Sequence, residues 1–240
     1  MKYEIIQSGS DGNATVVNGI LLIDCGVPYR RIEPFANDLK LVLLTHQHSD
    51  HFNPGTVKRL GRNRPTLRWA ACEWMVEHLL AAGIDKRNID VLFPNQWYSY
   101  HKVGLVEAFR TPHNVPNCGW KFIAWGEKLL YATDLGCIPD DLTALHFDYY
   151  LLEANHREAE LEARAAEKLE VGEFSYETAA AENHLSYEQA IEWLKDQMGP
   201  RSIWVPMHEH KEKERADDGL VRSASDACET SENTEAGKPS

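Results

Sequence analysis

Three histidines and one aspartate lie within six positions, directly after an apolar run. Residues 41–53 read LVLLTHQHSDHFN and contain the pattern H-x-H-x-D-H, formed by His46, His48, Asp50 and His51. Imidazole nitrogens and a carboxylate are ligands that suit Zn²⁺, and also Mn²⁺ or Fe²⁺. The alternative is a polar loop that holds histidines by accident, and a chance match is expected at a rate on the order of one in a thousand. The pattern therefore predicts a metal site.

Further polar side chains follow other apolar runs of the chain. His113 comes after VEAFRTP, Asp134 after KLLYAT and His208 after IWVPM. A residue just beyond a buried strand lies at the rim of its sheet, where functional side chains are commonly placed. We therefore expect four strand ends to converge along one edge of a sheet sandwich.

The elements that would position these residues indicate a mixed α/β chain. Many short strands come first, a helical segment follows late, and a single strand closes, which is not a regular βαβ alternation. Strands are expected at residues 2–7, 14–17, 20–24, 39–45, 66–72, 97–113, 120–134, 147–154 and 202–208, and helices or helical turns at 29–36, 54–62, 73–83, 157–170 and 186–198.

Two local motifs predict details of these elements. The segment WKFIAWGEKLLYATD predicts a hairpin with a two-residue Gly126–Glu127 turn, since type II′ turns have Gly at the first central position. Ser186 is expected to cap the helix at 186–198, with Gln189 as its capping-box partner three residues later.

Composition limits the class of protein. The chain has 240 residues, no basic segment followed by an apolar run at its start, and no stretch of 18 apolar residues. Its five cysteines are irregularly spaced, which favours reduced thiols and a cytoplasmic location. We expect no membrane association, and a homodimer is left open.

The acidity of the chain is concentrated in two segments. Of the net charge of −12, residues 156–183 carry −5 and residues 216–240 carry −4, which leaves −3 for the rest. The bulk charge therefore says little about the active face. We expect one domain over residues 1–214 and a disordered acidic tail over residues 215–240.

The ordered set of H-x-H-x-D-H, His, Asp and His resembles the metallo-β-lactamase superfamily over about residues 3–210. The segments SGSDGNATVV, LLIDCG, YATDLG and ENHLS are similar to the WalJ/YycJ branch, and the last two also to tRNase Z. Two departures are the Asn183–His184 pair, where Gly-His is usual, and VPMHEH, where the branch commonly has His-Leu-Ser. The resemblance implies a four-layer αβ/βα sandwich with a dinuclear metal site at the sheet edge.

The resemblance also implies a ligand set. His46, His48 and His113 would bind one metal, Asp50, His51 and His208 the other, and Asp134 would bridge them. Two divalent ions are implied, with zinc as the expected metal and manganese or iron as alternatives. In the antibiotic-hydrolysing enzymes a Cys usually replaces this Asp, and Cys137 lies three residues too late for that role. Hydrolysis of β-lactams is therefore not expected.

The charges of such a site favour an anionic electrophile. Two divalent ions, two aspartates and a bridging hydroxide sum to about +1, which suits a phosphodiester. Asp50 could accept the proton of the water, and His184 is the candidate donor to the leaving alkoxide; the alternative for His184 is local packing. Glu153, Asn155 and His156 are candidates for supporting the site without binding a metal. His156 and His210 are not counted as metal ligands.

The first hypothesis is a dinuclear metal-dependent hydrolase that cleaves phosphodiesters by a metal-bridged hydroxide, acting as a nuclease on DNA or RNA. Alternatives are a phosphodiesterase for a small cyclic nucleotide, a mononuclear iron protein that binds oxygen, and a catalytically dead scaffold. The complete ligand set counts against the last two. Downstream of the motif a run of cations either contacts the phosphates of the substrate or forms a solvated surface patch. These residues are Lys58, Arg59, Arg62, Arg64 and Arg68.

Overall fold

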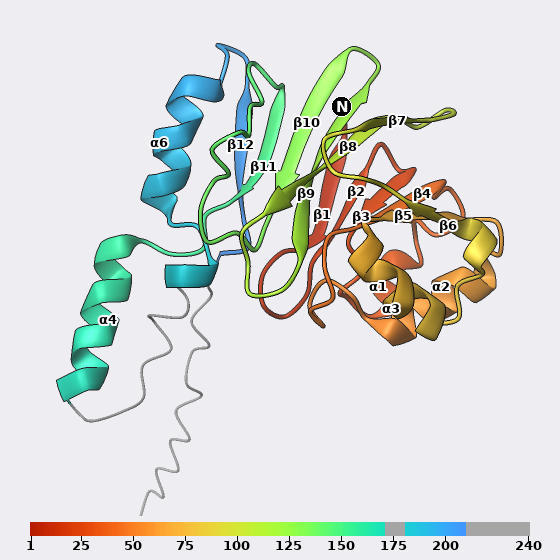
Figure 1. The fold of residues 1–240 in the computed structure, drawn as a ribbon, viewed down its shortest axis with the longest axis horizontal. Helices are drawn as coiled ribbons and strands as arrows, with labels where there is room; N and C mark the ends of the chain where they lie inside the picture. Colours follow the sequence, from red (N-terminus) through yellow and green to blue (C-terminus); the bar gives the residue numbers. More distant parts are fainter. Residues whose placement is uncertain (171–180, 210–240) are drawn as a thin grey trace, which may run out of the picture.

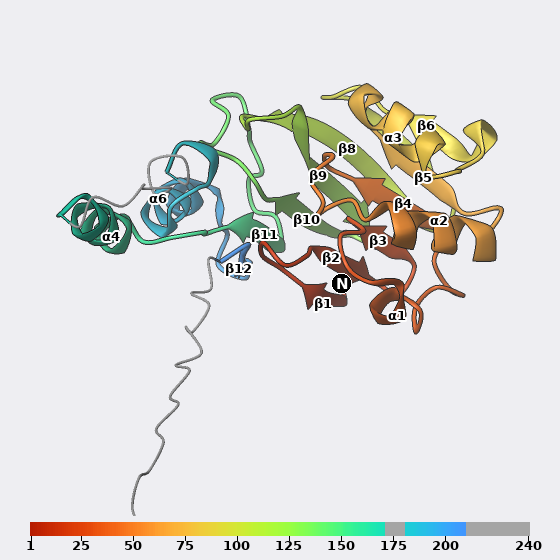
Figure 2. The same cartoon turned by 90° about the horizontal axis from the view of Figure 1, so that it is seen from below.

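The computed structural model describes residues 1–170 and 181–209 and shows two packed sheets flanked by helices (Figures 1 and 2). Each sheet has six strands. His210 and the tail expected over residues 215–240 lie outside the described residues. The order of the layers is helix, sheet, sheet, helix, which confirms the predicted fold class.

The first sheet runs from β1 to β6 in chain order, with antiparallel pairing up to β3 and parallel pairing beyond it. Its strands are β1 (Tyr3–Gln7), β2 (Ala14–Val17), β3 (Leu21–Ile23), β4 (Leu41–Leu44), β5 (Arg68–Ala71) and β6 (Ile89–Val91). Its helices are α1 (Tyr29–Ile32), α2 (Pro54–Asn63) and α3 (Val76–Ala81), with short 3₁₀ turns at Glu73–Met75 and Lys86–Asn88. Helix α2 begins where Asn53 accepts a hydrogen bond from the Thr56 amide and Pro54 occupies the first turn.

The second sheet has the order β12-β11-β10-β9-β8-β7. Its strands are β7 (Trp97–Tyr100), β8 (Gly104–Thr111), β9 (Asn117–Ala124), β10 (Glu127–Ala132), β11 (Tyr149–Glu153) and β12 (Ile203–Met207). The first four form an antiparallel meander, and β10, β11 and β12 are parallel. Helices α4 (Glu158–Glu170) and α6 (Tyr187–Gln197) follow β11, and the predicted capping box of Ser186 and Gln189 is present at the start of α6.

Strand β4 shows why the segment before the histidines is apolar at every position. Leu41 and Leu43 point into the core between the two sheets, whereas Val42 and Leu44 point into the core beneath the helices of the first sheet. A strand buried on both faces reads as a continuous apolar run. Because its body is fixed from both sides, the position of its end is fixed too.

The predicted turn of the β9–β10 hairpin is wrong by one residue. Ala124 pairs with Glu127, so the two central residues are Trp125 and Gly126. Both have positive φ, 52° and 81°, which is the pattern of a type I′ turn and not of type II′. The Trp125 side chain is 66% exposed and could not be recognised as a turn residue from its type.

Candidate metal centre and active site

The ends of four strands bring all seven predicted ligand residues together. The motif of three histidines follows β4, His113 follows β8, Asp134 follows β10 and His208 follows β12. Their ligand atoms form two groups within which all atoms lie within 4.8 Å of one another: His46, His48 and His113, and then Asp50, His51, Asp134 and His208. The convergence expected from the sequence is therefore present, while the role of each residue as a ligand stays a prediction.

The first group consists of imidazoles alone. Nδ1 of His48 lies 3.0 Å from Nε2 of His46 and 3.3 Å from Nε2 of His113. Nitrogens that bind one tetrahedral zinc at about 2.0–2.1 Å are separated by roughly 3.3 Å, so the spacing fits a shared metal. Burial, followed by the neighbouring His51, holds the pKa of His46 well below its usual value, and burial also lowers the pKa of His113. These two imidazoles are therefore neutral, which is the form that binds metals.

The second group is built around the buried carboxylate of Asp134. Its Oδ2 lies 2.8 Å from Nε2 of His51, and its Oδ1 lies 3.5 Å from Nε2 of His208. Asp50 Oδ2 is 3.4 Å from the same His208 nitrogen and 3.5 Å from His51 Nε2. Among the described residues no donor reaches Oδ2 of Asp134 with hydrogen-bond geometry. A buried carboxylate oxygen without a hydrogen-bond donor fits a site where a bound cation would satisfy it.

Electrostatics in this group are strong in the metal-free protein. Burial opposes the charged forms, but His51 and His208 outweigh it and hold the pKa of Asp134 well below its usual value. Burial likewise lowers the pKa of His208, but Asp134, Asp50 and Glu153 outweigh it and raise that pKa to about 10. Binding of a metal here would therefore displace protons from these histidines.

The imidazoles of His46, His51 and His113 each direct one nitrogen at the cluster while the other nitrogen has a partner. His51 Nδ1 donates to Asp24 Oδ2 at 2.7 Å, and His113 Nδ1 donates to the Asn183 carbonyl at 3.2 Å. His46 Nδ1 lies 3.0 Å from the Thr45 hydroxyl. Such partners fix the tautomer and the orientation of metal-binding histidines. The hydrogen bonds of the outward-facing nitrogens therefore also fit a metal centre.

Asp24 holds a supporting position at the candidate site that the sequence reasoning missed. Besides His51, its carboxylate accepts hydrogen bonds from the Thr45 amide at 2.9 Å, the Thr45 hydroxyl at 3.0 Å and the Tyr131 hydroxyl at 3.3 Å. The signal was available, because Asp24 follows the apolar run ILLI just as Asp134 follows KLLYAT. It lies at the end of β3, next to the end of β4.

The loop that holds the motif is fixed by Asn13 and Gly26. The Asn13 amide donates to the Asp50 carbonyl at 2.6 Å, and its side-chain amide reaches Nε2 of His51 at 2.8 Å. A Cβ on Gly26 would lie 1.7 Å from the same Asp50 carbonyl oxygen. The N-terminal SGSDGN element and the LLIDCG segment therefore position the metal-site loop.

His184 and Glu153 form the wall of the site beside the second group. His184 Nδ1 lies 2.8 Å from Glu153 Oε1, and its ring stacks on that of His208 with 5.1 Å between centroids. Burial opposes charge on His184, but the hydrogen bond to Glu153 outweighs it and raises the pKa of the imidazole. Asn155 donates to the His208 carbonyl at 2.8 Å, whereas His156 contacts Ser186 through a backbone bridge and stays outside the cluster.

A third grouping, made of Asp134, Glu153, His184 and His208, also satisfies the distance criterion for a metal. The lone pairs of Glu153 are already used, however. Its Oε2 accepts from the Leu135 amide at 2.9 Å and from the Leu185 amide at 3.2 Å, while Oε1 faces His184. We therefore assign Glu153 to supporting the two histidines and not to binding a metal.

These groups open into a pocket of about 320 Å³. Its uncharged polar lining includes Ser10, Asn114, Asn155 and Asn183, and no Lys or Arg of the described chain lines it. The cations predicted downstream of the motif are partly used elsewhere, since Arg68 pairs with Asp90 and Arg64 donates to the carbonyls of Ala36 and Leu39. For these two, the alternative of phosphate binding is not supported.

Comparison with known proteins places this site in a family. The model of the beta-lactamase superfamily domain matches residues 20–208. The chain belongs to the beta-lactamase superfamily. This agrees with the resemblance seen in the sequence.

Known proteins similar to the chain include a bacterial nuclease and two proteins of known structure. The exodeoxyribonuclease WalJ of Streptococcus pneumoniae is 27% identical over 174 residues, which are 65% of this chain and 62% of WalJ. The chain thus spans less than two thirds of that relative. Among solved structures, human tRNase Z (short form) has a TM-score of 0.66 at 17% identity, and the match covers 87% of this chain and 93% of the tRNase Z chain. Zn²⁺-bound PqqB of Methylobacterium extorquens has a TM-score of 0.67 at 16% identity, with 87% and 89% covered.

No helix in residues 1–170 and 181–209 is both long enough and apolar enough to span a membrane.

Proposed function

We propose that the chain is a dinuclear metal-dependent phosphodiesterase that acts as a nuclease on DNA. The observation that carries this proposal is that both ligand groups reach one pocket: His48 and His113 of the first group and Asp50, Asp134 and His208 of the second line it. The similarity to WalJ, which is named an exodeoxyribonuclease, supports DNA as the substrate.

The residues present fit two divalent cations. His46, His48 and His113 would hold one, Asp50, His51 and His208 the other, and Asp134 would contact both. When bound, two such ions supply an activated water and positive charge that stabilises a phosphoryl transition state. Zinc is the expected metal because the donors are imidazoles and carboxylates at tetrahedral spacing.

The chain's own residues would then handle the protons. Asp50 is partly buried, but His208 and His51 outweigh the effect of burial and lower its pKa, so its carboxylate is ionised and has a lone pair that can accept a proton from the attacking water. His184 holds a proton at Nδ1 against Glu153, which leaves Nε2 as the nitrogen that can serve the leaving oxygen. The raised pKa of His184 suits a donor that is protonated before the reaction.

The lining of the pocket favours a diester over a monoester. A phosphate monoester brings about two negative charges, which commonly require Lys or Arg in addition to metals. The described lining offers amides and a hydroxyl instead, which can position one charge without neutralising a second. The same lining also suits a small cyclic nucleotide, which is the second candidate substrate.

A substrate screen tests the proposal. Purified protein loaded with Zn²⁺ or Mn²⁺ is assayed on single-stranded DNA, duplex DNA, a tRNA precursor and cyclic mononucleotides. We expect DNA to be cleaved with metal-dependent kinetics. If only the tRNA precursor or only a cyclic nucleotide is cleaved, that molecule is the substrate and not DNA. If none of the four is hydrolysed, the proposed activity is wrong.

A further inference from the structure

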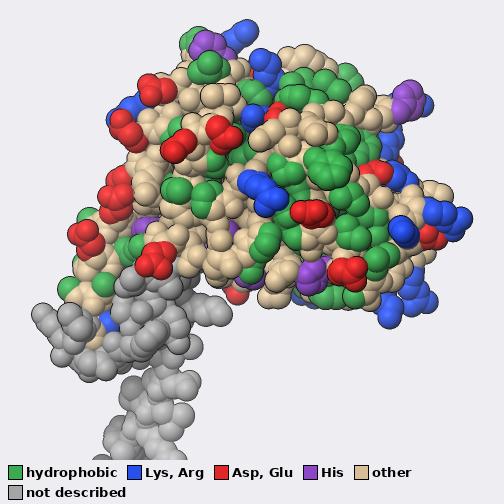
Figure 3. All heavy atoms as spheres, viewed as in Figure 1, with side chains coloured by type: hydrophobic (Ala, Val, Ile, Leu, Met, Phe, Trp, Pro, Cys, Tyr) green, Lys and Arg blue, Asp and Glu red, His purple; other side chains and the backbone are tan. Residues whose placement is uncertain are grey.

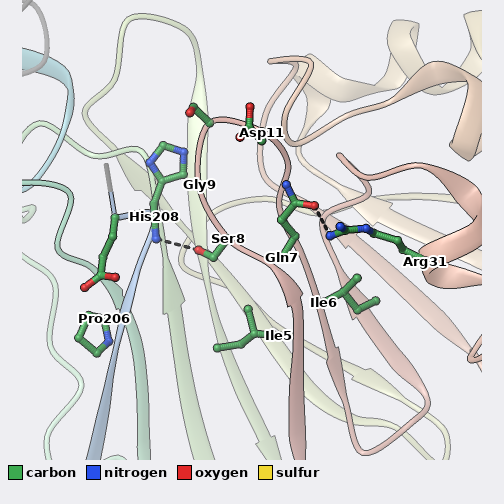
Figure 4. A pocket seen from close by; sticks show the side chains of 11 residues that line it. Ile5, Ile6, Gln7, Ser8, Gly9, Asp11, Arg31, Pro206 and His208 are labelled. Carbon is green, nitrogen blue, oxygen red and sulfur yellow. Dashed lines mark hydrogen bonds between the residues drawn. The ribbon is translucent and has the colours of Figure 1, made fainter. Parts of the chain in front are cut away.

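A second and larger cavity lies beside the metal site, between the edges of the two sheets (Figure 4). It has a volume of about 490 Å³ and runs along β1 towards the end of β12. Ser10, His208 and Glu209 line both this cavity and the pocket over the metal groups. The two spaces therefore adjoin at His208, and a molecule bound at the metals can extend into the second one.

Arg31 is the cation that faces this cavity. No other Lys or Arg within residues 1–170 and 181–209 lines it or the pocket over the metal groups. Its guanidinium donates to the side-chain oxygen of Gln7, as the close view shows. Because Gln7 is neutral and no carboxylate of the described chain forms an ion pair with Arg31, its charge stays available to a ligand.

Two other arginines in this half of the molecule are paired. Arg59 lies 3.6 Å from Glu33 and over the Tyr29 ring, and Arg68 pairs with Asp90. On the face drawn in Figure 3, acidic side chains lie over α4 and α6, while Lys and Arg are more frequent at the opposite end, on the side of α2. Helix α1, which carries Arg31, lies on the side of α2 (Figures 1 and 2). A polyanion is thus attracted towards the Arg31 side of the metal site.

We propose that this cavity binds the nucleotide next to the scissile phosphodiester, with Arg31 contacting the phosphate of that nucleotide. The inference rests on the proposed nuclease function and adds a substrate subsite to it. Gln7 holds the guanidinium in place. The carboxylate of Glu209, which also lines the cavity, can accept hydrogen bonds from the sugar hydroxyls or base N–H groups of a nucleotide, whereas it repels a bare anion.

Binding without catalysis tests the subsite directly. A fluorescein-labelled oligothymidylate is titrated with protein in EDTA, where cleavage is suppressed, and anisotropy gives Kd at several salt concentrations. We expect Arg31→Gln to raise Kd about tenfold and to reduce the slope of log Kd against log salt by about 0.7, the effect of losing one phosphate contact on a single strand. Arg31→Lys should retain most of the slope because it keeps the charge.

Arg30 provides a matched control. It is the neighbouring arginine of α1, is exposed, and does not line the cavity. Arg30→Gln removes the same charge from the same helix and should leave both Kd and the slope unchanged. Equal effects of the two substitutions would mean that only the general field of the helix matters, and would overturn the proposal.

Kinetics with metal separate this inference from the proposed function. For each variant, kcat/KM is measured on an oligothymidylate and on bis(p-nitrophenyl) phosphate, which has no flanking nucleotide. We expect the ratio of the two values to fall about tenfold in Arg31→Gln and to stay at the wild-type value in Arg30→Gln. If wild-type protein cleaves the oligonucleotide but the ratio is unaffected by Arg31→Gln, the subsite is wrong while the nuclease function stands. If wild-type protein cleaves no oligonucleotide, the nuclease function fails and the inference fails with it.

Discussion

Replacing His184 with alanine isolates its proposed role in proton transfer. His184 belongs to neither group of expected ligands: it is held by Glu153 at 2.8 Å and stacks on His208, while its Nδ1 stays 3.9 Å from Asp134 Oδ1. The substitution should therefore leave both metals bound. Loss of a general acid lowers kcat by about 10²–10⁴-fold, which corresponds to roughly 3–5 kcal/mol of transition-state stabilisation. The loss should apply to a phosphodiester whose leaving group is an alkoxide, because that oxygen needs a proton.

The assay compares two leaving groups and counts metals in the same samples. Rates are measured on an oligonucleotide and on bis(p-nitrophenyl) phosphate, whose leaving phenolate scarcely needs protonation, so His184→Ala should lose much less rate there. His101→Ala serves as the control, since His101 is exposed in the turn between β7 and β8 and belongs to none of the ligand groups. On the oligonucleotide, kcat of the wild-type protein should fall at high pH as His184 loses its proton, because the raised pKa of His184 sets that fall. The fall should be absent from His184→Ala.

Two results would refute this reasoning. An equal loss of rate on both substrates, with metals retained, would mean that His184 positions the substrate and donates no proton. A loss of one metal would mean that the third grouping, with Glu153 and His184 as ligands, is the real second site.

Three further predictions concern the metals. The wild-type chain should bind about two transition-metal ions by elemental analysis and Asp134→Ala fewer, whereas one ion in both proteins would refute the bridge. Asp24→Asn should weaken zinc binding about 10–100-fold in competition with a chelator, because His51 loses its oriented partner; unchanged affinity would contradict that role. The metal-free protein should lose stability as pH rises from about 6.5 to about 10: folded His208 keeps its proton up to about 10, whereas the unfolded chain releases it near 6.5. Denaturant titrations in EDTA should show a decrease of no more than about 5 kcal/mol, and a flat profile would contradict the charge pairing of His208.

The parts of the site that could be predicted are those encoded locally. H-x-H-x-D-H is a dense pattern, and His113, Asp134 and His208 each stand directly after an apolar run that forms a buried strand. A strand places its last residue at a rim whatever the rest of the fold does. The convergence of these ends was therefore visible in the sequence, together with the layered α/β architecture.

The parts that could not be predicted depend on contacts between distant residues. Asp24 reaches His51 across 27 positions, and Glu153 reaches His184 across 31. Arg68 belonged to a patch that looked free for phosphates until the fold placed Asp90 beside it. Arg31, which carries no motif at all, emerges only because α1 packs beside the end of β1.

The backbone at the site indicates that the protein is organised before a metal arrives. Asp24, Asp134 and His208, each just beyond a strand, adopt positive φ of 60°, 58° and 55°. Asp and His tolerate this region better than most residues, but each such conformation still costs on the order of 1 kcal/mol. These conformations persist here because hydrogen bonds hold the side chain or the backbone amide in place. One example is the Ser8 hydroxyl, which accepts a hydrogen bond from the His208 amide at 2.7 Å. Because the sheets hold these strained positions in place, a cation bound there would meet a preformed set of donors, and its binding energy would not be consumed in ordering the loops.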